Sequence, residues 1–207
     1  MTVKSVLISL ILTSGLFFAC SYSNNDASAQ TSFSLQLAKS AVSLTADDVE
    51  YDPSYFTISY PNGDVPANKG VCTDVVIRAY RKMNIDLQKL VHEDMKKRFN
   101  EYPQKWGLKG PDKNIDHRRV PNLMCFLGRY GKTKGTGNTP SEYAPGDIVC
   151  WDLGSGLLHI GVLSDVKSSD GKRYQVVHNI GAGQILEDCL FQYKIIGHYS
   201  FEGSNTK

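Results

Sequence analysis

The chain has 207 residues, of which 41% are hydrophobic, 21% charged and 10% aromatic. This length suits one well-packed domain and is short for two. A formal net charge of +2 provides no broad basic surface, so we expect no nucleic-acid partner. Five cysteines are too few for a disulfide-dense mini-protein. The sequence therefore predicts one globular domain behind a leader.

The leader begins with Lys4 and an uncharged run over residues 5–19. The length of this run is typical of a secretory signal and short for a membrane-spanning helix. Cleavage after the Ala-Ser-Ala sequence at 27–29 and acylation of Cys20, as in a bacterial lipoprotein, are both open alternatives. An uncleaved N-terminal anchor is a third. We expect an exported protein of the periplasm or cell envelope, with residues 1–29 as leader and tether and with membrane attachment only through a lipid on Cys20.

The first half of the mature chain is predicted to be mainly helical. Apolar residues at 33, 37, 41 and 44 favour a short amphipathic helix over residues 33–45. Residues 55–60 alternate like a short strand and precede a Pro-Asn-Gly-Asp turn. The segment 131–141 is rich in glycine and is expected to be flexible. Three further helices are predicted over residues 70–83, 87–99 and 120–130.

From Asp147 onward the sequence changes to short β-rich runs separated by Gly, Ser and Asp, which predict an antiparallel meander. Helices first and strands afterwards predict an α+β domain over residues 30–207, with N-terminal helices packed on a C-terminal antiparallel β-sheet. The predicted strands are residues 147–151, 157–163 and 173–180, followed by two segments after Gly183 and Lys194.

Cys72 lies at the predicted start of a helix, in the sequence Gly-Val-Cys-Thr-Asp. Free backbone N–H groups and the helix dipole favour a thiolate at such a position. The thiolate is the nucleophile in cysteine catalysis. However, Cys72 also falls on the apolar stripe of this helix, so a buried, inert cysteine is the alternative.

His159 and His178 each lie inside an otherwise apolar predicted strand. A hairpin turn centred between Ser168 and Ser169 would place the two histidines opposite one another. Other even-length loops shift the register by two and keep both on one face, whereas an odd-length loop separates them. Gly161, on the face of His159, would let a helix or a substrate approach closely.

A cysteine that faces two histidines is typical of thiol–imidazole catalysis, in which one histidine is the base and the second polar group orients it. A zinc site with Cys72, His159 and His178 as ligands is the competing interpretation, and two structural histidines are another. The sequence has no close ligand pair such as C-x-x-C or H-E-x-x-H in this set. We therefore expect no metal and no cofactor.

Several ordered motifs resemble known families. A helix-borne cysteine, then PGDIV at 145–149, HIGVL at 159–163 and a third strand with a polar residue are similar to the NlpC-type, papain-like cell-wall hydrolases. More closely, residues 51–201 resemble the YijF-like family of domains of unknown function within that superfamily. The motifs that carry this likeness are YPNGDVP, GVCTDVVIRAYR, NIDHRRVPNL, PGDIVCW, HIGVL, VVHNIGAG and GHYSF.

The resemblance implies a papain-like α+β fold, with Cys72 as nucleophile, His159 as base and His178 as the orienting residue. Tyr60, twelve residues before the cysteine, matches a tyrosine that stabilises the oxyanion. The hydrolases usually read Asp-Cys-Ser-Gly, whereas Thr73 and an aspartate follow the cysteine here. The substrate groove is therefore expected to differ.

The implied function is hydrolysis of an amide bond in peptidoglycan peptides, as an endopeptidase or an amidase, by a monomer. Arginine binds the carboxylates of wall peptides in bidentate fashion, although the His-Arg-Arg triplet is equally explained as a solvated loop paired with nearby aspartates. Glu187 is expected to be a solvated strand end. A non-catalytic wall-binding module and a Cys/His acyltransferase are the alternative functions. The substrate-binding candidates are Asp74, His117, Arg118, Arg119 and Asn179, and spacing assigns no disulfide among Cys125, Cys150 and Cys189.

Overall fold

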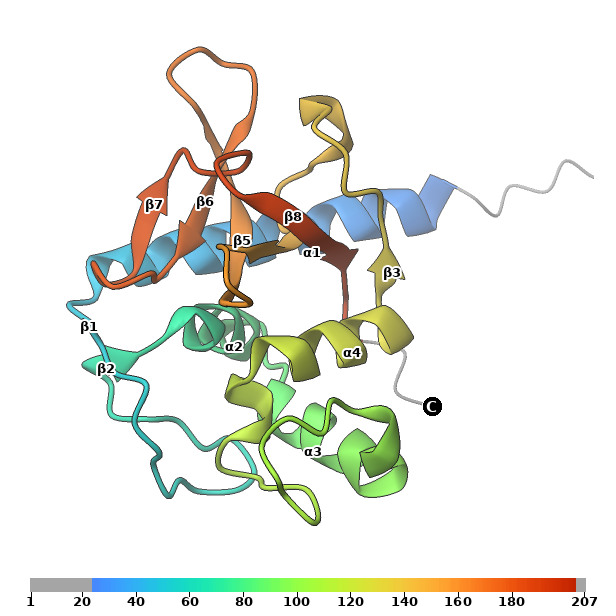
Figure 1. The fold of residues 1–207 in the computed structure, drawn as a ribbon. Coiled ribbons are helices and arrows are strands. Elements are labelled where there is room, and N and C mark those ends of the chain that lie inside the picture. The colour runs from blue at the N-terminus through green and yellow to red at the C-terminus, as the bar shows by residue number, and fades with distance from the viewer. Residues whose placement is uncertain (1–23, 204–207) are drawn as a thin grey trace, which may run out of the picture.

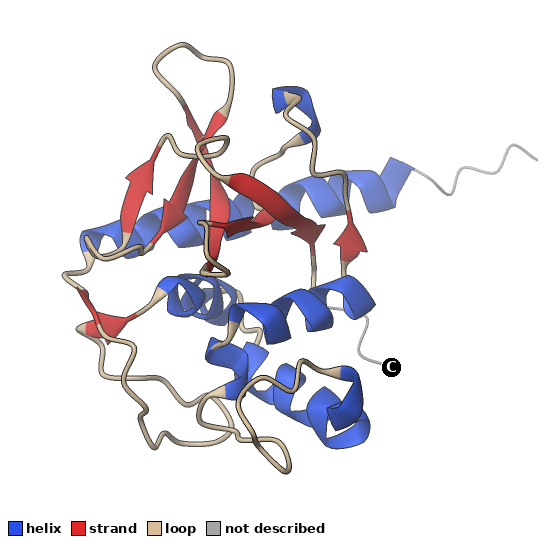
Figure 2. Cartoon of the chain, viewed as in Figure 1, coloured by secondary structure: helices blue, strands red, loops and turns tan. Residues whose placement is uncertain are grey.

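The computed structural model describes residues 24–203, which form an α+β domain with helices and an antiparallel sheet (Figures 1 and 2). Most of the predicted leader, including Cys20, lies outside the described residues. Within them, no helix combines the length and apolar character that crossing a membrane requires.

The described residues contain four α-helices, and three of them confirm the predicted ranges to within two residues. The first helix instead begins at Asn24, well before the predicted start at Phe33, because the polar segment ahead of its apolar stripe continues the helix. The helices are α1 (Asn24–Ser43), α2 (Cys72–Lys82), α3 (Leu87–Arg98) and α4 (Val120–Tyr130).

The strands form a six-stranded antiparallel sheet and a separate parallel pair, β1 with β2. The order in the sheet is β3-β8-β4-β5-β6-β7. Thus β4 to β7 form the expected meander, whereas β8 returns to pair with β4. The strands are β1 (Glu50–Tyr51), β2 (Lys69–Gly70), β3 (Lys132–Thr133), β4 (Ile148–Asp152), β5 (Leu158–Lys167), β6 (Tyr174–His178), β7 (Ile185–Glu187) and β8 (Lys194–Ser200).

Two local predictions are wrong. Residues 55–60 form a loop, in which side chains satisfy the backbone: Asn114 accepts from the Ile58 N–H, and Gln88 donates to the carbonyl of Ser59. No neighbouring strand pairs with this alternating segment in the described chain. Conversely, the glycine-rich segment 131–141 contains β3, which pairs with β8 at the edge of the sheet.

The two faces of the sheet belong to different apolar clusters. Helices α1, α2 and α4 cover one face, where Ile160 and Val162 of β5 join their core, and Figure 2 shows α2, α3 and α4 gathered on one side of the strands. Leu163 of β5 packs with Trp151 and Leu190 on the opposite face. Since side chains alternate along a strand, His159 projects from β5 on the face of Leu163, away from the helices.

Candidate active site

His159 and His178 are in direct contact: Nε2 of His159 lies 2.8 Å from Nδ1 of His178. The predicted register is wrong by two residues, since Val162 pairs with Val177 where that register paired it with Gln175. The turn lies later in the chain than predicted, since Lys167 pairs with Tyr174, and an irregularity between Leu163 and Lys167 then brings the register back to within two residues of the predicted one. A shift of two preserves the face, so the two rings still meet, on a diagonal of the sheet.

Gly161 makes this diagonal contact possible. A Cβ atom at this position would lie 2.7 Å from Cγ1 of Val176 and 3.2 Å from Cβ of His178. The space that the glycine leaves is therefore filled by β6 and its histidine, rather than by a helix or a substrate as expected.

Glu187 completes a hydrogen-bonded series behind the histidines. Its Oε2 atom lies 2.9 Å from Nε2 of His178. A carboxylate only accepts, so the His178 Nε2 carries the proton and its Nδ1 accepts from the Nε2–H of His159. The Nδ1 atom of neutral His159 is then left as a free base. The glutamate thus sets the tautomer of both rings.

Both histidines are neutral at neutral pH. Burial, and secondarily the neighbouring His178, lowers the pKa of His159 to about 3. Burial also lowers the pKa of His178, although Glu187 opposes this. Sequence reasoning assigned Glu187 to solvent, but continuing the meander by one more strand places it on the face of His178, because Glu187 pairs with Val176.

Cys72 is the first residue of α2, and its side chain is almost completely buried. Burial raises the pKa of its thiol to about 12, while the backbone N–H groups of Ile160, Thr73 and Cys72 itself lower it. The helix N-terminus therefore does not outweigh burial, and the resting thiol is protonated. Its sulfur lies against the residue that follows His159, and within residues 24–203 no hydrogen bond joins it to the His159 ring.

An open groove of about 490 Å³ gives access to Cys72. It runs between the start of α2, the start of α4 and the turn from β4 to β5. The guanidinium of Arg119 lies 4.0 Å from the ring centroid of Trp106 in this groove, which is a cation–π contact. The lining residues include Tyr51, Lys105, Trp106, Arg119, Pro121 and Leu157.

Tyr60, the predicted oxyanion residue, does not line this groove. Its hydroxyl donates to Glu93 of α3 at 2.6 Å, and its ring packs against His92. Tyr51 lines the groove instead. It lies on β1 opposite Gly70, two residues before Cys72, and burial, together with the nearby Cys72, raises the pKa of its hydroxyl. The short parallel pair of β1 and β2 leaves no periodic pattern in the sequence. The position of Tyr51 next to the groove could therefore not be predicted from the sequence.

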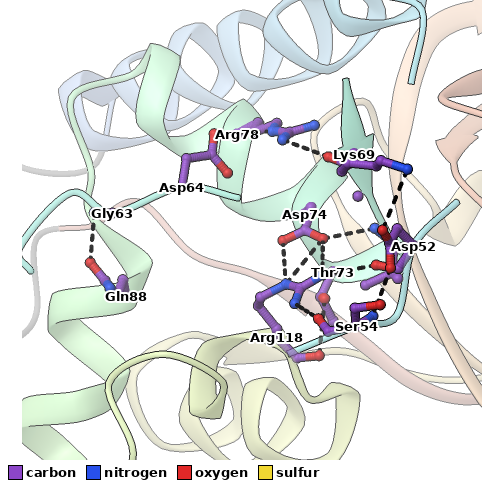
Figure 3. A network of polar contacts seen from close by, with 12 residues as sticks. Asp52, Ser54, Gly63, Asp64, Lys69, Thr73, Asp74, Arg78, Gln88 and Arg118 are labelled. Carbon is purple, nitrogen blue, oxygen red and sulfur yellow. Dashed lines mark hydrogen bonds and ion pairs between the residues drawn. The ribbon is translucent and has the colours of Figure 1, made fainter. Parts of the chain in front are cut away.

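Asp74 and Arg118 form a buried ion pair that fixes the start of α2 (Figure 3). The Arg118 Nε and Nη2 atoms each lie 3.0 Å from an oxygen of Asp74. Asp74 also accepts from the N–H of Val71 at 2.7 Å, while Arg118 donates to the carbonyls of Asp52 and Ser54. With these partners, the two side chains support the segment that carries Cys72. Arg118 also contributes to the wall of the groove, whereas Asp74 does not line it.

The remaining substrate-binding candidates separate into one groove residue and two buried ones. Arg119 lines the groove and pairs with Asp116 at 3.6 Å. His117 is buried, and burial lowers its pKa to about 3. Asn179 is buried and donates to the carbonyl of Gly70 at 3.3 Å, which ties the end of β6 to the approach to α2.

A further buried histidine is structural. His198 of β8 contacts Asp147 at 2.8 Å through Nε2 and the carbonyl of Gly135 at 2.8 Å through Nδ1. Asp147 also accepts from Lys134 and from the N–H of Ala144. The aspartate of the PGDIV motif therefore anchors the β3–β4 connection to the sheet, remote from the groove.

A comparison with known protein families matches the part of the chain that contains these residues. The profile of a family described as "Domain of unknown function (DUF1287)" matches residues 38–201. The chain is also 54% identical over 172 residues to the "Uncharacterized protein YijF" of Escherichia coli (strain K12), with 83% of each protein covered. The predicted resemblance to the YijF-like family is thereby confirmed.

Proposed function

The chain belongs to the family of the domain of unknown function DUF1287, and from this premise we propose that it is an exported cysteine hydrolase that cleaves an amide bond in peptidoglycan peptides. The observation that carries the proposal is the series His159–His178–Glu187, which leaves a free imidazole nitrogen next to the strand segment against which Cys72 packs. We also propose that the fold is of the NlpC-type, papain-like class.

In the proposed reaction, the Cys72 sulfur attacks the amide carbonyl while its proton passes to Nδ1 of His159. Because the resting thiol and imidazole are both neutral and lie on different faces of β5, we propose that this transfer occurs during attack, when the sulfur leaves the N–H of Ile160 and both side chains turn toward one another at the start of the strand. Burial shields the Cys72 thiol and the His159 imidazole from water. His178 stabilises the His159 imidazolium by accepting a hydrogen bond from its Nε2–H.

The tetrahedral intermediate carries a negative oxygen that needs preorganised donors. The backbone N–H groups of Cys72 and Thr73 at the start of α2 supply donors beside the sulfur, and the hydroxyl of Tyr51, which lines the same groove, assists them. His159 then returns its proton to the leaving amine. Water hydrolyses the thioester with the same histidine as base, which restores the thiol and releases the acid.

The groove favours an acidic peptide as substrate. Lys105 and Arg119 supply positive charge, and Trp106 with Leu157 supplies apolar contact area next to Cys72. Wall peptides carry several carboxylates, for which arginine offers a two-pronged donor. The uncharged run at residues 5–19 supports export to the compartment that contains this substrate.

Mass spectrometry of purified muropeptides after incubation with the protein tests this function. We expect an 18-Da increase divided between two product fragments, in chelator as well as without it, because the dyad needs no metal. Cys72→Ala should give no products, whereas Cys125→Ala, a matched change of another free cysteine, should cleave normally. Binding of muropeptides without cleavage would support a wall-binding module instead.

A further inference from the structure

A second group of ligand atoms lies behind the histidine pair, on β6, β7 and the loop that follows. His178 Nε2, a carboxylate oxygen of Glu187 and the Cys189 Sγ all lie within 4.8 Å of one another. The nitrogen is 2.9 Å from the carboxylate oxygen and 3.6 Å from the sulfur. In a tetrahedral zinc site, Zn–N bonds of about 2.0–2.1 Å and Zn–S bonds of about 2.3 Å separate nitrogen from sulfur by about 3.5 Å.

We propose that His178, Glu187 and Cys189 form a binding site for a divalent zinc-like cation, and that the cation inhibits the enzyme. Imidazole, thiolate and carboxylate together are a donor set that suits zinc. This set differs from the Cys72–His159–His178 ligands considered from the sequence, because neither the nucleophile nor the base belongs to it.

Burial and access also fit such a site. His178 and Cys189 are buried, whereas the Glu187 side chain is 43% exposed. The glutamate therefore marks the side from which a cation enters and on which a water completes four-coordination. The 2.9 Å contact between Glu187 and His178 must widen by a few tenths of an ångström, which the exposed carboxylate can do by moving outward.

Inhibition follows from the tautomers and rests on the proposed function. A metal on Nε2 of His178 requires a lone pair there, so the proton of this neutral ring must reside on Nδ1. The His178 Nδ1–H then donates to Nε2 of His159, whose own proton must move to Nδ1. That nitrogen can no longer accept the proton of Cys72. The balance of the exchange is one cation bound and one proton released, from the thiol of Cys189.

The test is a titration of the metal-free protein with Co²⁺, which gives a near-ultraviolet charge-transfer band when a thiolate binds it. We expect the band at about one Co²⁺ per chain in the wild type, in Cys72→Ala and in Cys125→Ala, and its loss on addition of Zn²⁺. Cys189→Ala should lack the band, and Cys189→Ser, which keeps the side-chain size, should lack it as well while its circular dichroism matches that of the wild type.

Three results would overturn the site: no band in the wild type, a band that persists in Cys189→Ser, or a band lost in Cys72→Ala. The second measurement is the rate of muropeptide hydrolysis, relative to each protein's own rate in chelator. Stoichiometric Zn²⁺ should slow the wild type at least tenfold and leave the relative rate of Cys189→Ser unchanged. Binding without this slowing would contradict the tautomer exchange, whereas an inactive wild type with a normal band would contradict only the proposed hydrolase.

Discussion

His159 and His178 share a 2.8 Å hydrogen bond although the sheet does not pair them directly. The bond spans a diagonal, and Gly161 leaves the space that it requires. Because Glu187 accepts from the far nitrogen of His178, the protons of the whole series point in one direction. Glu187 on β7 therefore determines which nitrogen of His159, two strands away on β5, is free to act as the base.

His178→Ala should lower kcat by about 10²- to 10⁴-fold, since general base catalysis depends on an oriented imidazole. His178→Asn and His178→Gln should recover part of the loss, because an amide oxygen accepts from the Nε2–H of His159. The check is muropeptide hydrolysis beside a thermal melt for each variant. His198→Ala is the matched control: it removes a buried histidine remote from the groove and should reduce Tm while preserving the activity per folded molecule. Equal behaviour of the two alanine variants would show that His178 is only structural.

Glu187→Ala should reduce kcat by about tenfold with little change in KM, because water can partly replace a half-exposed carboxylate. Glu187→Gln should be milder, since its amide oxygen still accepts from His178. Nitrogen NMR of the histidine rings measures the tautomer of His159 directly. The wild type should show His159 protonated on Nε2, and the alanine variant a mixture of tautomers. An unchanged tautomer with reduced activity would contradict the positioning role.

Asp74→Ala should lower the free energy of unfolding by about 3–5 kcal/mol, because it leaves the buried guanidinium of Arg118 unpaired. Urea denaturation measures this loss. The exposed pair of Glu93 and Lys96, 3.5 Å apart, offers a comparison: Lys96→Ala should change the stability by less than about 1 kcal/mol. Similar losses for both variants would mean that the Asp74–Arg118 pair does not secure the start of α2.

Acid should destabilise the fold partly through His117. Its folded-state pKa is about 3 against an ordinary 6.5, because of burial. The unfolded chain therefore takes up a proton first, and the stability that neutral His117 contributes is complete above pH 6.5 and lost as the pH falls toward 3. Each pH unit in this window costs at most about 1.4 kcal/mol.

Asp116 acts in the opposite sense. Burial raises its pKa from 3.8 to about 6, so its contribution is complete below pH 3.8 and is lost as the pH rises through 6. Comparing the wild type with His117→Gln across this range isolates the histidine. The difference in unfolding free energy between them should shrink as the pH falls from 7 to 4, and a constant difference would contradict the prediction.

Local signals predicted much of the fold. The apolar stripe of α2 and the proline in the first turn of α4 identified those helices closely, and the strands from Ile148 onward follow the predicted β-rich runs. Segment 55–60 alternates between apolar and polar residues and is nevertheless a loop, because a strand also needs a neighbouring strand with which to pair. Pairing depends on tertiary structure, which explains why β3 and the return of β8 to β4 were missed.

The candidate site likewise has one part that local sequence signals predicted and another part that depends on tertiary structure. The meeting of His159 with His178 needed only strand alternation and survived the wrong register, since a shift of two keeps the face. Tyr51 and Glu187 approach the site from other strands, through pairings that no local pattern indicates. Burial is also invisible in a short motif: the helix N-terminus predicted a thiolate at Cys72, but desolvation raises the pKa of the thiol.

The central claim is that the Cys72 sulfur forms a covalent bond with the carbonyl carbon of a wall peptide. Acid quenching of the enzyme during muropeptide turnover, followed by intact-protein mass spectrometry and peptide mapping, tests it most directly. The account predicts an added mass equal to the acyl part of the substrate, located on Cys72 and absent in Cys72→Ala. Cleavage of muropeptides by Cys72→Ala, or an adduct located on Cys189 instead, would contradict it.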